Sequence, residues 1–404
     1  MKNTSPPGDG LLEICRNFGE IALTVSCGVG IIGTVQKEKG GGEMNKRALA
    51  IILAAWILLA LAGCGGKAEE EPPPTPVENE YPAPPPEPVP EPEPDVPAGI
   101  NPLTGLPMEP EYENLRPIAI MLNNLKAAQP QLGISQADII YEVPVEGGIT
   151  RMLCLYQTVE GIETLGSVRS ARPYFVELAL GHDAVYVHAG GSQEAYSNLR
   201  SWKVDHMDGV RGGDDAQIFW RDPDRKRNNG YEHSLITSGE KILEYLDEGK
   251  VPTEHGVGWN YLQAFTEDGT PAAGETAEHI KVRFSGYKTG TFDYDAATGK
   301  YLVGQYGKEH VDGDTGDQVS AANVLVLKTS TAVLDDVGRL RVRTTGEGEG
   351  LFFCGGKTVP IQWSRKDRNS AFSYTLEDGR SLALRQGNSY VCILSPKTST
   401  VEYE

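Results

Sequence analysis

Ile118-Ala119-Ile120-Met121-Leu122 and Ile139-Ile140-Tyr141-Glu142-Val143-Pro144-Val145 are the two apolar runs that decide the fold of this 404-residue chain. Short runs of this kind, rich in Ile and Val, predict buried strands. A turn of helix is expected at residues 135–138, directly before the second strand. Strands separated by helical segments indicate a layered fold rather than an all-β one.

Helix and strand signals continue to alternate after these runs. Residues 173–180 predict a helix that begins with a proline and ends before a glycine, and residues 184–188 predict a strand. Ser192 and Ser238 each precede a helical pattern and have the side chain of an N-cap. Residues 101–250 are therefore expected to form an N-terminal α/β-type domain.

The C-terminal part of the chain has a different pattern. Residues 278–404 contain short strand patterns separated by turn signals such as Asp295-Ala296-Ala297-Thr298-Gly299 and Glu377-Asp378-Gly379, without a helical pattern. We expect a smaller, mostly β C-terminal domain there, joined to the first by a linker at residues 251–277. The predicted fold class is mixed, α+β overall.

An export signal lies near the start of the chain. Lys46-Arg47 is followed by an apolar run of 13 residues, 48–60, and then by Leu61-Ala62-Gly63-Cys64. The run is too short for a permanent membrane span, which needs about 20 residues, but it suits a secretory signal. Leu-Ala-Gly-Cys resembles the lipobox of bacterial lipoproteins. The resemblance implies a signal peptide at residues 44–63 and a Cys64 that carries diacylglycerol and palmitate, anchoring the chain to the extracytoplasmic face of the cell membrane.

The segments that flank this signal are not expected to fold. Lys39-Gly40-Gly41-Gly42-Glu43 is what a ribosome-binding site gives when it is read in frame, so we expect translation to start at Met44 and residues 1–43 to be an extension upstream of it. Residues 64–100 hold 13 of the 27 prolines, nine acids and one lysine. Because such a segment buries too little apolar surface to offset its ordering entropy, we expect a disordered stalk; a Pro-rich partner ligand is the alternative.

Several kinds of chemistry are absent from the sequence. The formal net charge of −19 argues against nucleic-acid binding, which relies on clusters of Lys and Arg. Neither Gly-x-Ser-x-Gly nor His-Glu-x-x-His occurs. Ser238-Gly239-Glu240-Lys241 and Lys288-Thr289-Gly290 imitate two motifs of penicillin-binding enzymes, but the third is missing. We expect no catalytic residue and no cofactor.

Histidines are candidate metal ligands in this sequence, and two cysteines are candidates for a disulfide. No two histidines of the first domain have the i, i+4 spacing of helical ligands, so we expect hydrogen-bonded histidines rather than a metal site. Residues 312–317 have the composition of a calcium loop but lack its final Glu, which favours a β-turn. Cys354 and Cys392 could form a disulfide in an oxidising compartment, and the sequence leaves this open. The four histidines are His182, His188, His206 and His233.

Several motifs between Arg116 and Ser192 resemble those of the YerB-like bacterial lipoproteins, a two-domain family of uncharacterised function. The resemblance covers residues 101–404 and the lipobox, and it implies an N-terminal α/β-type domain and a smaller C-terminal domain. It implies no reaction. The motifs are Ala137-Asp138-Ile139-Ile140-Tyr141-Glu142, Glu146-Gly147-Gly148-Ile149-Thr150-Arg151, Gly166-Ser167-Val168-Arg169-Ser170-Ala171-Arg172-Pro173-Tyr174, Val187-His188-Ala189-Gly190-Gly191-Ser192 and His233-Ser234-Leu235-Ile236-Thr237-Ser238.

Three arginines form the sharpest candidate for a binding site. Val159-Glu160-Gly161 fits a three-residue hairpin loop with a left-handed glycine, and a hairpin centred there would place Arg151 opposite Arg169. Two facing arginines repel each other unless something negative lies between them. Arg172 precedes Pro173 at the start of a predicted helix, whose first N–H groups also favour anions. This predicts a site for phosphate or carboxylate.

The predicted site continues into a strand–glycine–helix turn at residues 188–192, a position where α/β domains bind ligands. An internal ion network is the alternative, in which Glu142 and Glu146 neutralise the arginines and no ligand is needed. The candidate anion-binding residues are Arg151, Arg169, Ser170, Arg172, His188, Gly190, Gly191, Ser192 and His233.

These observations favour a non-catalytic lipoprotein that binds an anionic cell-wall ligand or a protein partner in the cell envelope. One alternative is an enzyme acting on phosphorylated wall polymers or precursors with His188 or His233 as acid and base, which requires a carboxylate within hydrogen-bond reach of the histidine. Another is a protein–protein scaffold, which requires arginines paired to Glu142 and Glu146 and an apolar surface patch elsewhere.

The lipid anchor can be tested directly. Cys64→Ala should release the protein from membranes, because the thiol that accepts the lipid is gone, whereas deleting residues 1–43 should leave localisation unchanged. Fractionation of cells into membrane and soluble proteins measures both effects. Membrane retention of Cys64→Ala without detergent would contradict the lipobox assignment.

Overall fold

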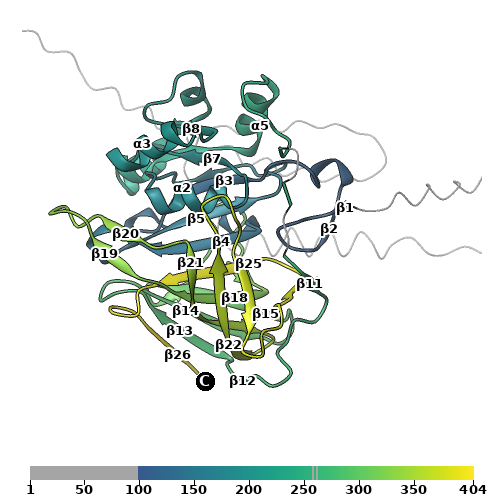
Figure 1. Cartoon of the computed structure of the whole chain (residues 1–404). Helices are drawn as coiled ribbons and strands as arrows, with labels where there is room; N and C mark the ends of the chain where they lie inside the picture. Colours follow the sequence, from purple (N-terminus) through teal and green to yellow (C-terminus); the bar gives the residue numbers. More distant parts are fainter. Residues whose placement is uncertain (1–98, 257–258, 261–262) are drawn as a thin grey trace, which may run out of the picture. The chain divides into compact units, whose positions relative to one another are not determined.

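Both apolar runs lie in the middle of an eleven-stranded mixed sheet (Figure 1). The structure is a computed structural model that describes residues 99–404, apart from 257–258 and 261–262. In order across the sheet, with β23 (Ser373–Leu376) pairing with β22 alone, the strands are β12 (Glu275–Thr276), β22 (Lys357–Arg365), β21 (Gly346–Cys354), β18 (Asn323–Lys328), β25 (Ser389–Leu394), β4 (Ile139–Pro144), β5 (Thr150–Tyr156), β3 (Ile118–Asn123), β7 (Val185–His188) and β8 (His206–Asp208).

The predicted signal peptide, Cys64 and almost all of the stalk lie outside the described residues. Within the described part of the chain, no helix is both long and apolar enough to cross a membrane.

Four α-helices accompany the strands, and the sequence predicted three of them. The hydroxyl of Ser192 accepts a hydrogen bond from the Ala195 N–H at 3.2 Å, and that of Ser238 accepts one from the Lys241 N–H at 3.2 Å. Both predicted N-caps are therefore confirmed. The α-helices of the described residues are α2 (Pro173–Leu180), α3 (Gln193–Ser201), α4 (Pro223–Asn228) and α5 (Gly239–Asp247).

Short 3-10 helices and small sheets fill the connections. The turn of helix expected before the second strand is present as Ile134–Gln136. The other 3-10 helices are Pro110–Tyr112, Lys126–Ala128, Glu146–Gly148, Asp214–Ile218 and Tyr231–His233. The strands of the small sheets are β1 (Gly99–Ile100), β2 (Pro107–Met108), β6 (Leu165–Gly166), β9 (Trp220–Arg221), β10 (Leu235–Thr237), β11 (Phe265–Thr266), β19 (Thr331–Val333), β20 (Leu340–Val342) and β24 (Leu384–Arg385).

A second, antiparallel sheet of six strands belongs to the C-terminal part of the chain. Its inward residues Ile280, Phe292 and Val303 share one buried cluster with Ile140 and Cys154 of the main sheet. No described residue after α5 is in an α-helix, which confirms the mostly β C-terminal region and the mixed fold class. The strands are β16 (Lys308–Glu309), β15 (Lys300–Gln305), β14 (Thr289–Asp295), β13 (His279–Arg283) and β26 (Thr400–Tyr403), with β17 (Ser320–Ala321) paired to β15.

The hairpin predicted around residues 159–161 is wrong, although its turn is present. Gly161 has the expected positive φ of 74°. However, β5 pairs with β3 on one side and with β4 on the other, so both of its edges are already hydrogen-bonded. The chain therefore leaves the sheet after the turn, and β6 pairs with β10 instead.

The disulfide that the sequence left open is not formed. Cys354 and Cys392 are both buried free thiols. They lie in β21 and β25, with β18 between those strands, and they belong to the hydrophobic clusters on opposite faces of the sheet. Two side chains that project in opposite directions from non-adjacent strands cannot meet.

The main sheet joins the N-terminal and C-terminal parts of the chain. Its central contact is the parallel pair β25–β4, in which Ser389 lies opposite Ile139 and Cys392 opposite Glu142. Next to this contact, Glu142 of β4 forms an ion pair with Lys288, which directly precedes β14, at 3.3 Å. Each of these two side chains is only 1% exposed.

Hydrogen bonds surround this buried ion pair. Glu142 accepts from the Thr150 hydroxyl at 2.6 Å, from the Asn124 amide at 2.9 Å and from the Tyr390 hydroxyl at 2.5 Å. The ammonium of Lys288 also donates to the side-chain oxygen of Gln305. Burial lowers the pKa of Lys288, and the charge of Glu142 opposes that shift. Because neither charged group is solvated by water, each is stabilised by the opposite charge of the other.

The ion pair should be needed for stability. Lys288→Met leaves the Glu142 carboxylate buried without a cation, which costs about 3–5 kcal/mol. The double variant Glu142→Gln with Lys288→Met should lose less than the sum of the two single variants, because no charge remains unpaired. Unfolding in urea measures each value.

Lys281→Met is the matched control for this experiment. Lys281 lies in the same six-stranded sheet, but its side chain is 56% exposed. Its exposed ion pair with Glu402 contributes about 1 kcal/mol or less. Equal stability losses for Lys288→Met and Lys281→Met would contradict the structural role of the buried pair.

Candidate functional site

Residues 169–172, which contain Arg169 and Arg172, cross the carboxyl ends of the parallel strands β3 and β7. The Arg169 N–H donates to the carbonyl of Met121 in β3 at 2.8 Å, and the Ala189 N–H after β7 donates to the carbonyl of Arg169 at 3.0 Å. Ala171 then donates to the carbonyl of Gly190 at 2.9 Å. The segment therefore lies at the sheet edge where α/β proteins bind ligands.

Arg151 and Arg172 are held by one carboxylate, that of Glu146. Arg151 donates to it at 3.2 Å and to the Ser170 carbonyl at 2.7 Å, and Arg172 donates to it through Nε at 3.1 Å and also through Nη2. The two arginine side chains are 5% and 9% exposed. Burial would raise the pKa of Glu146, but the hydrogen bond from Arg172 and the charges of both arginines outweigh it and lower that pKa. This pair of arginines forms an internal network.

Two details of the predicted site are wrong. Arg151 lies opposite Asn123 and Val143 in the sheet rather than opposite Arg169, because β5 pairs with β3 and β4. Glu142 does not reach the arginines. It lies opposite Met152 in the sheet, and successive side chains of a strand point to opposite faces, so Glu142 and Arg151 lie on different faces.

Arg169 is the accessible member of the group. Its side chain is 24% exposed, its guanidinium contacts Glu232 at 2.9 Å, and the Glu232 side chain is itself 68% exposed. His233, the next residue, accepts a hydrogen bond at Nδ1 from the Asn123 amide at 2.8 Å, so its proton is on Nε2. Burial and the charge of Arg169 lower the pKa of His233. Arg169 thus contacts one exposed carboxylate, and the residue next to that carboxylate in sequence is a histidine with a lowered pKa.

At the glycine turn of residues 188–192, the backbone N–H of Gly190 is hydrogen-bonded to a side chain of the protein itself. The Gly190 N–H donates to the Asp208 carboxylate at 2.8 Å, and that carboxylate also accepts from the Val210 N–H at 2.9 Å and from the Tyr196 hydroxyl at 2.7 Å. Asp208 is 2% exposed. It occupies the position that an external anion would take at such a turn. Gly191 lies beside Ala171 in a parallel bridge, and the hydroxyl of Ser192 caps α3.

His188 is buried and uncharged beside this turn. Its Nδ1–H donates to the carbonyl of Gly190 at 2.8 Å, and Nδ1 lies 3.8 Å from the Asp208 carboxylate, outside hydrogen-bond distance. Burial lowers the pKa of His188 to about 4, against the charge of Asp208. In the described part of the chain, no three His, Cys, Asp or Glu side chains are grouped to hold a metal ion.

A cavity of about 430 Å³ lies at the carboxyl end of β8, beyond the glycine turn. Arg200 of α3 and Arg211 line it, together with Tyr196 and Asp208. The guanidinium of Arg211 lies 4.3 Å above the ring of Tyr196. The sequence did not point to these arginines, because they belong to no motif that it shares with known sites.

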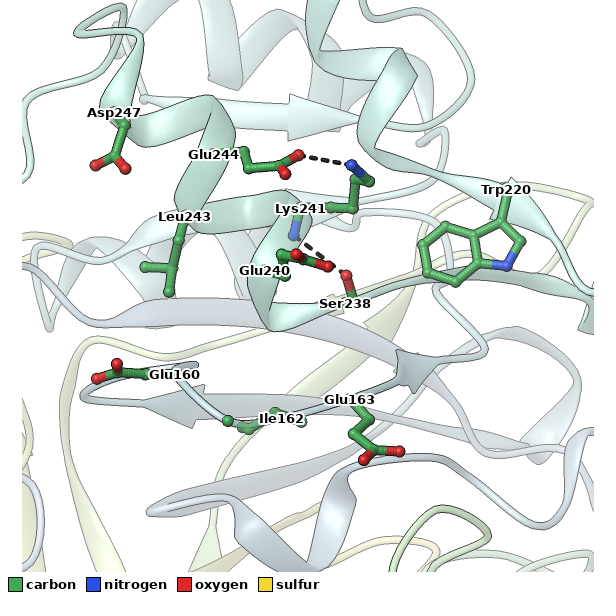
Figure 2. Close-up of a pocket in the computed structure, with 11 residues that line it drawn as sticks. Glu160, Ile162, Glu163, Trp220, Ser238, Glu240, Lys241, Leu243, Glu244 and Asp247 are labelled. Atoms are coloured by element: carbon green, nitrogen blue, oxygen red, sulfur yellow. Dashed lines mark hydrogen bonds and ion pairs between the residues drawn. The ribbon is translucent and has the colours of Figure 1, made fainter.

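A larger groove, of about 790 Å³, lies beside α5 and is acidic (Figure 2). Its single lysine, Lys241, is bound to Glu244 at 2.6 Å, and Trp220 lies at one side, 40% exposed. The excess of carboxylates repels anions. An anionic ligand is therefore directed instead to the sheet edge that carries Arg151, Arg169 and Arg172, which we call the arginine edge. The acidic residues of the groove are Glu160, Glu163, Glu240, Glu244 and Asp247.

The comparisons with known proteins agree with this architecture. The model of the family described as "Protein of unknown function (DUF3048) N-terminal domain" matches residues 103–252, and that of the corresponding C-terminal domain matches residues 280–391. The protein named "Putative lipoprotein YerB", from Bacillus subtilis (strain 168), is 31% identical over 296 residues, which cover 72% of this chain and 85% of that protein.

A solved structure shows the same fold. The crystal structure of the YerB protein from Bacillus subtilis has a TM-score of 0.65 and 28% sequence identity, and it covers 75% of this chain and 99% of that chain. The resemblance found in the sequence motifs is therefore confirmed. The chain, which is similar to the YerB protein of Bacillus subtilis, belongs to the DUF3048 family of proteins of unknown function.

Proposed function

We propose that this chain is a lipoprotein, anchored through Cys64 to the extracytoplasmic face of the cell membrane, that binds an anionic ligand of the cell envelope without catalysing a reaction. The name of its relative and the lipobox that ends at Cys64 support the anchor. The arginine edge supports the ligand class, because guanidinium groups bind phosphate and carboxylate with charge-assisted hydrogen bonds.

The exposed ion pair between Arg169 and Glu232 is the observation that carries the proposal. Exposed pairs of this kind contribute little to stability, so an external anion can replace Glu232 at low cost. Behind Arg169, Arg151 and Arg172 share the single carboxylate of Glu146. The group therefore has three guanidiniums and two carboxylates, one of which points into solvent, and its excess positive charge favours an anion.

The two histidines of the site support binding rather than catalysis. His188 is fully buried, and its pKa of about 4 makes it a weak base at neutral pH. His233 is bound through Nδ1 to an amide rather than to a carboxylate that would orient it as an acid or base.

A protein partner is the second candidate, because an exposed apolar tip joins β19 to β20. Val333 and Val337 are 68% and 65% exposed there, and Leu334 is 37% exposed. Scattered apolar residues are common on surfaces, but three in one hairpin, at the end of β19 and in the loop that follows, form a small patch. Val333→Asp together with Val337→Asp should then abolish co-purification of a membrane protein, and Arg169→Gln should leave it unchanged.

Anion binding at Arg169 predicts a saturable effect of phosphate on thermal stability. Sodium phosphate should raise the melting temperature of the wild type more than sodium chloride does at equal ionic strength. Arg169→Gln should remove the saturable part, a loss of about tenfold or more in affinity for a contact of about 1.5–3 kcal/mol. Glu232→Gln should increase the affinity, because the competing carboxylate is gone.

Arg227→Gln is the matched control, because Arg227 is also paired to an exposed carboxylate, that of Asp224, and carries the same charge. Non-specific stabilisation by phosphate has no saturation point and persists in every variant. The proposal fails if Arg169→Gln keeps the saturable effect, or if Glu232→Gln weakens binding.

A further inference from the structure

We propose that the cavity lined by Arg200 and Arg211 is a second anion position on the same sheet edge, and that the ligand is a chain with several phosphate groups that spans both positions. This inference rests on the proposed function of Arg169. It replaces a single small anion with a linear polyanion as the ligand class.

Among the residues that the structure describes, the cavity is lined by two arginines that are not paired to a carboxylate, beside Asp208 and Asp215. Arg200 and Arg211 are exposed, and within the described residues neither guanidinium is in an ion pair. Stacking on Tyr196 holds Arg211 in place at the cavity without using its N–H groups. Since an arginine fixed in this way loses less side-chain entropy on binding, it is suited to capture an anion.

The carboxylates of the cavity are already engaged by the protein. Asp208 accepts hydrogen bonds from Gly190, Val210 and Tyr196, and one oxygen of Asp215 accepts from the Asp208 N–H at 2.7 Å. Burial opposes ionisation of Asp208, but the hydrogen bonds from Gly190, Tyr196 and Val210 help to lower its pKa. The negative charges of Asp208 and Asp215 are thus partly offset by the hydrogen-bond donors around them. The N–H donors of the two arginines remain available.

The two arginine positions flank one glycine. A methyl group added at Gly190 would lie 3.5 Å from a methyl carbon of Val210 and 3.7 Å from the hydroxyl of Ser170. Arg169 directly precedes Ser170, and Arg211 directly follows Val210. Because β7 and β8 are parallel neighbours, with His188 opposite Asp208, both arginines come from loops at the carboxyl ends of adjacent strands. Ser170 and Val210, which neighbour the two arginines in sequence, therefore meet at the buried Gly190.

A ligand that reaches both positions gains from multivalency. Once one phosphate group is bound at Arg169, the next groups of the same chain are held near Arg211 at a high effective concentration. Such linkage strengthens binding by about 10²–10⁴ without any new contact. A single phosphate ion has no such gain and binds each position independently.

The experiment compares inorganic phosphate, triphosphate and linear polyphosphate by isothermal titration calorimetry on the folded protein. Polyphosphate should bind about 100-fold tighter than inorganic phosphate per chain. Arg169→Gln and Arg211→Gln should each weaken polyphosphate binding about tenfold or more, and the double variant should lose less than the product of the two losses. Arg200→Gln is a second variant of the cavity, and Arg227→Gln is the charge-matched control that should change nothing.

The outcomes separate this inference from the proposed function. If inorganic phosphate binds in a way that requires Arg169, but polyphosphate is no tighter or is indifferent to both Arg211→Gln and Arg200→Gln, the polyanion inference is wrong and the proposed function stands. If no phosphate binding depends on Arg169, the proposed function fails and the spanning ligand fails with it. Equal weakening by Arg227→Gln would show non-specific attraction and would overturn both.

Discussion

The buried ion pair between Glu142 and Lys288 is the constraint on which the rest of the structure depends. It joins a strand of the N-terminal part to a residue at the start of a strand in the C-terminal part, where both side chains are 1% exposed. Two charges in such a place are stable only together, so the two sheets must dock in one register. The parallel contact of β25 with β4 beside the pair continues the main sheet from one part into the other. The two matched family regions therefore share one hydrophobic core and one sheet.

The same strands that hold the ion pair also position the candidate site. Thr150 points to one face of β5 and donates to Glu142, and Arg151 points to the other face and donates to Glu146. The period-two alternation of a strand thus separates a structural charge network from a surface one by a single residue. Arg151 and Glu146 in turn fix Arg172 and the Ser170 carbonyl, which leaves Arg169 at the accessible edge. A change that moves β5 in the sheet would disturb both networks together.

Local sequence signals predicted individual helices and strands, whereas the pairing between strands depends on long-range contacts that the sequence does not reveal. The N-caps Ser192 and Ser238 and the apolar runs of β3 and β4 depend on near neighbours, so their patterns are readable. The pairing partner of β5 depends on strands far apart in sequence, and the hairpin prediction failed for that reason. Lys288 belongs to an incomplete imitation of an enzyme motif, yet its spacing of two and four residues from the buried Gly290 and Phe292 puts it in line with the inward face of β14, which it directly precedes. The hydrogen bond between Asp208 and the Gly190 N–H could not have been inferred from the sequence, because it depends on the parallel pairing of β7 and β8.

The most direct test of this account is to express residues 99–252, the part that contains the N-terminal family match, and to compare it with residues 99–404 by heteronuclear NMR and urea unfolding. The account predicts that the fragment lacks dispersed amide signals and a cooperative transition, because the edge of β4 loses its neighbour β25 and Glu142 loses Lys288 and Tyr390. It also predicts that adding residues 253–404 in trans restores part of the dispersed spectrum. A fragment that unfolds cooperatively on its own, with a native-like spectrum, would contradict the claim that one sheet and one buried ion pair make the two parts a single folding unit.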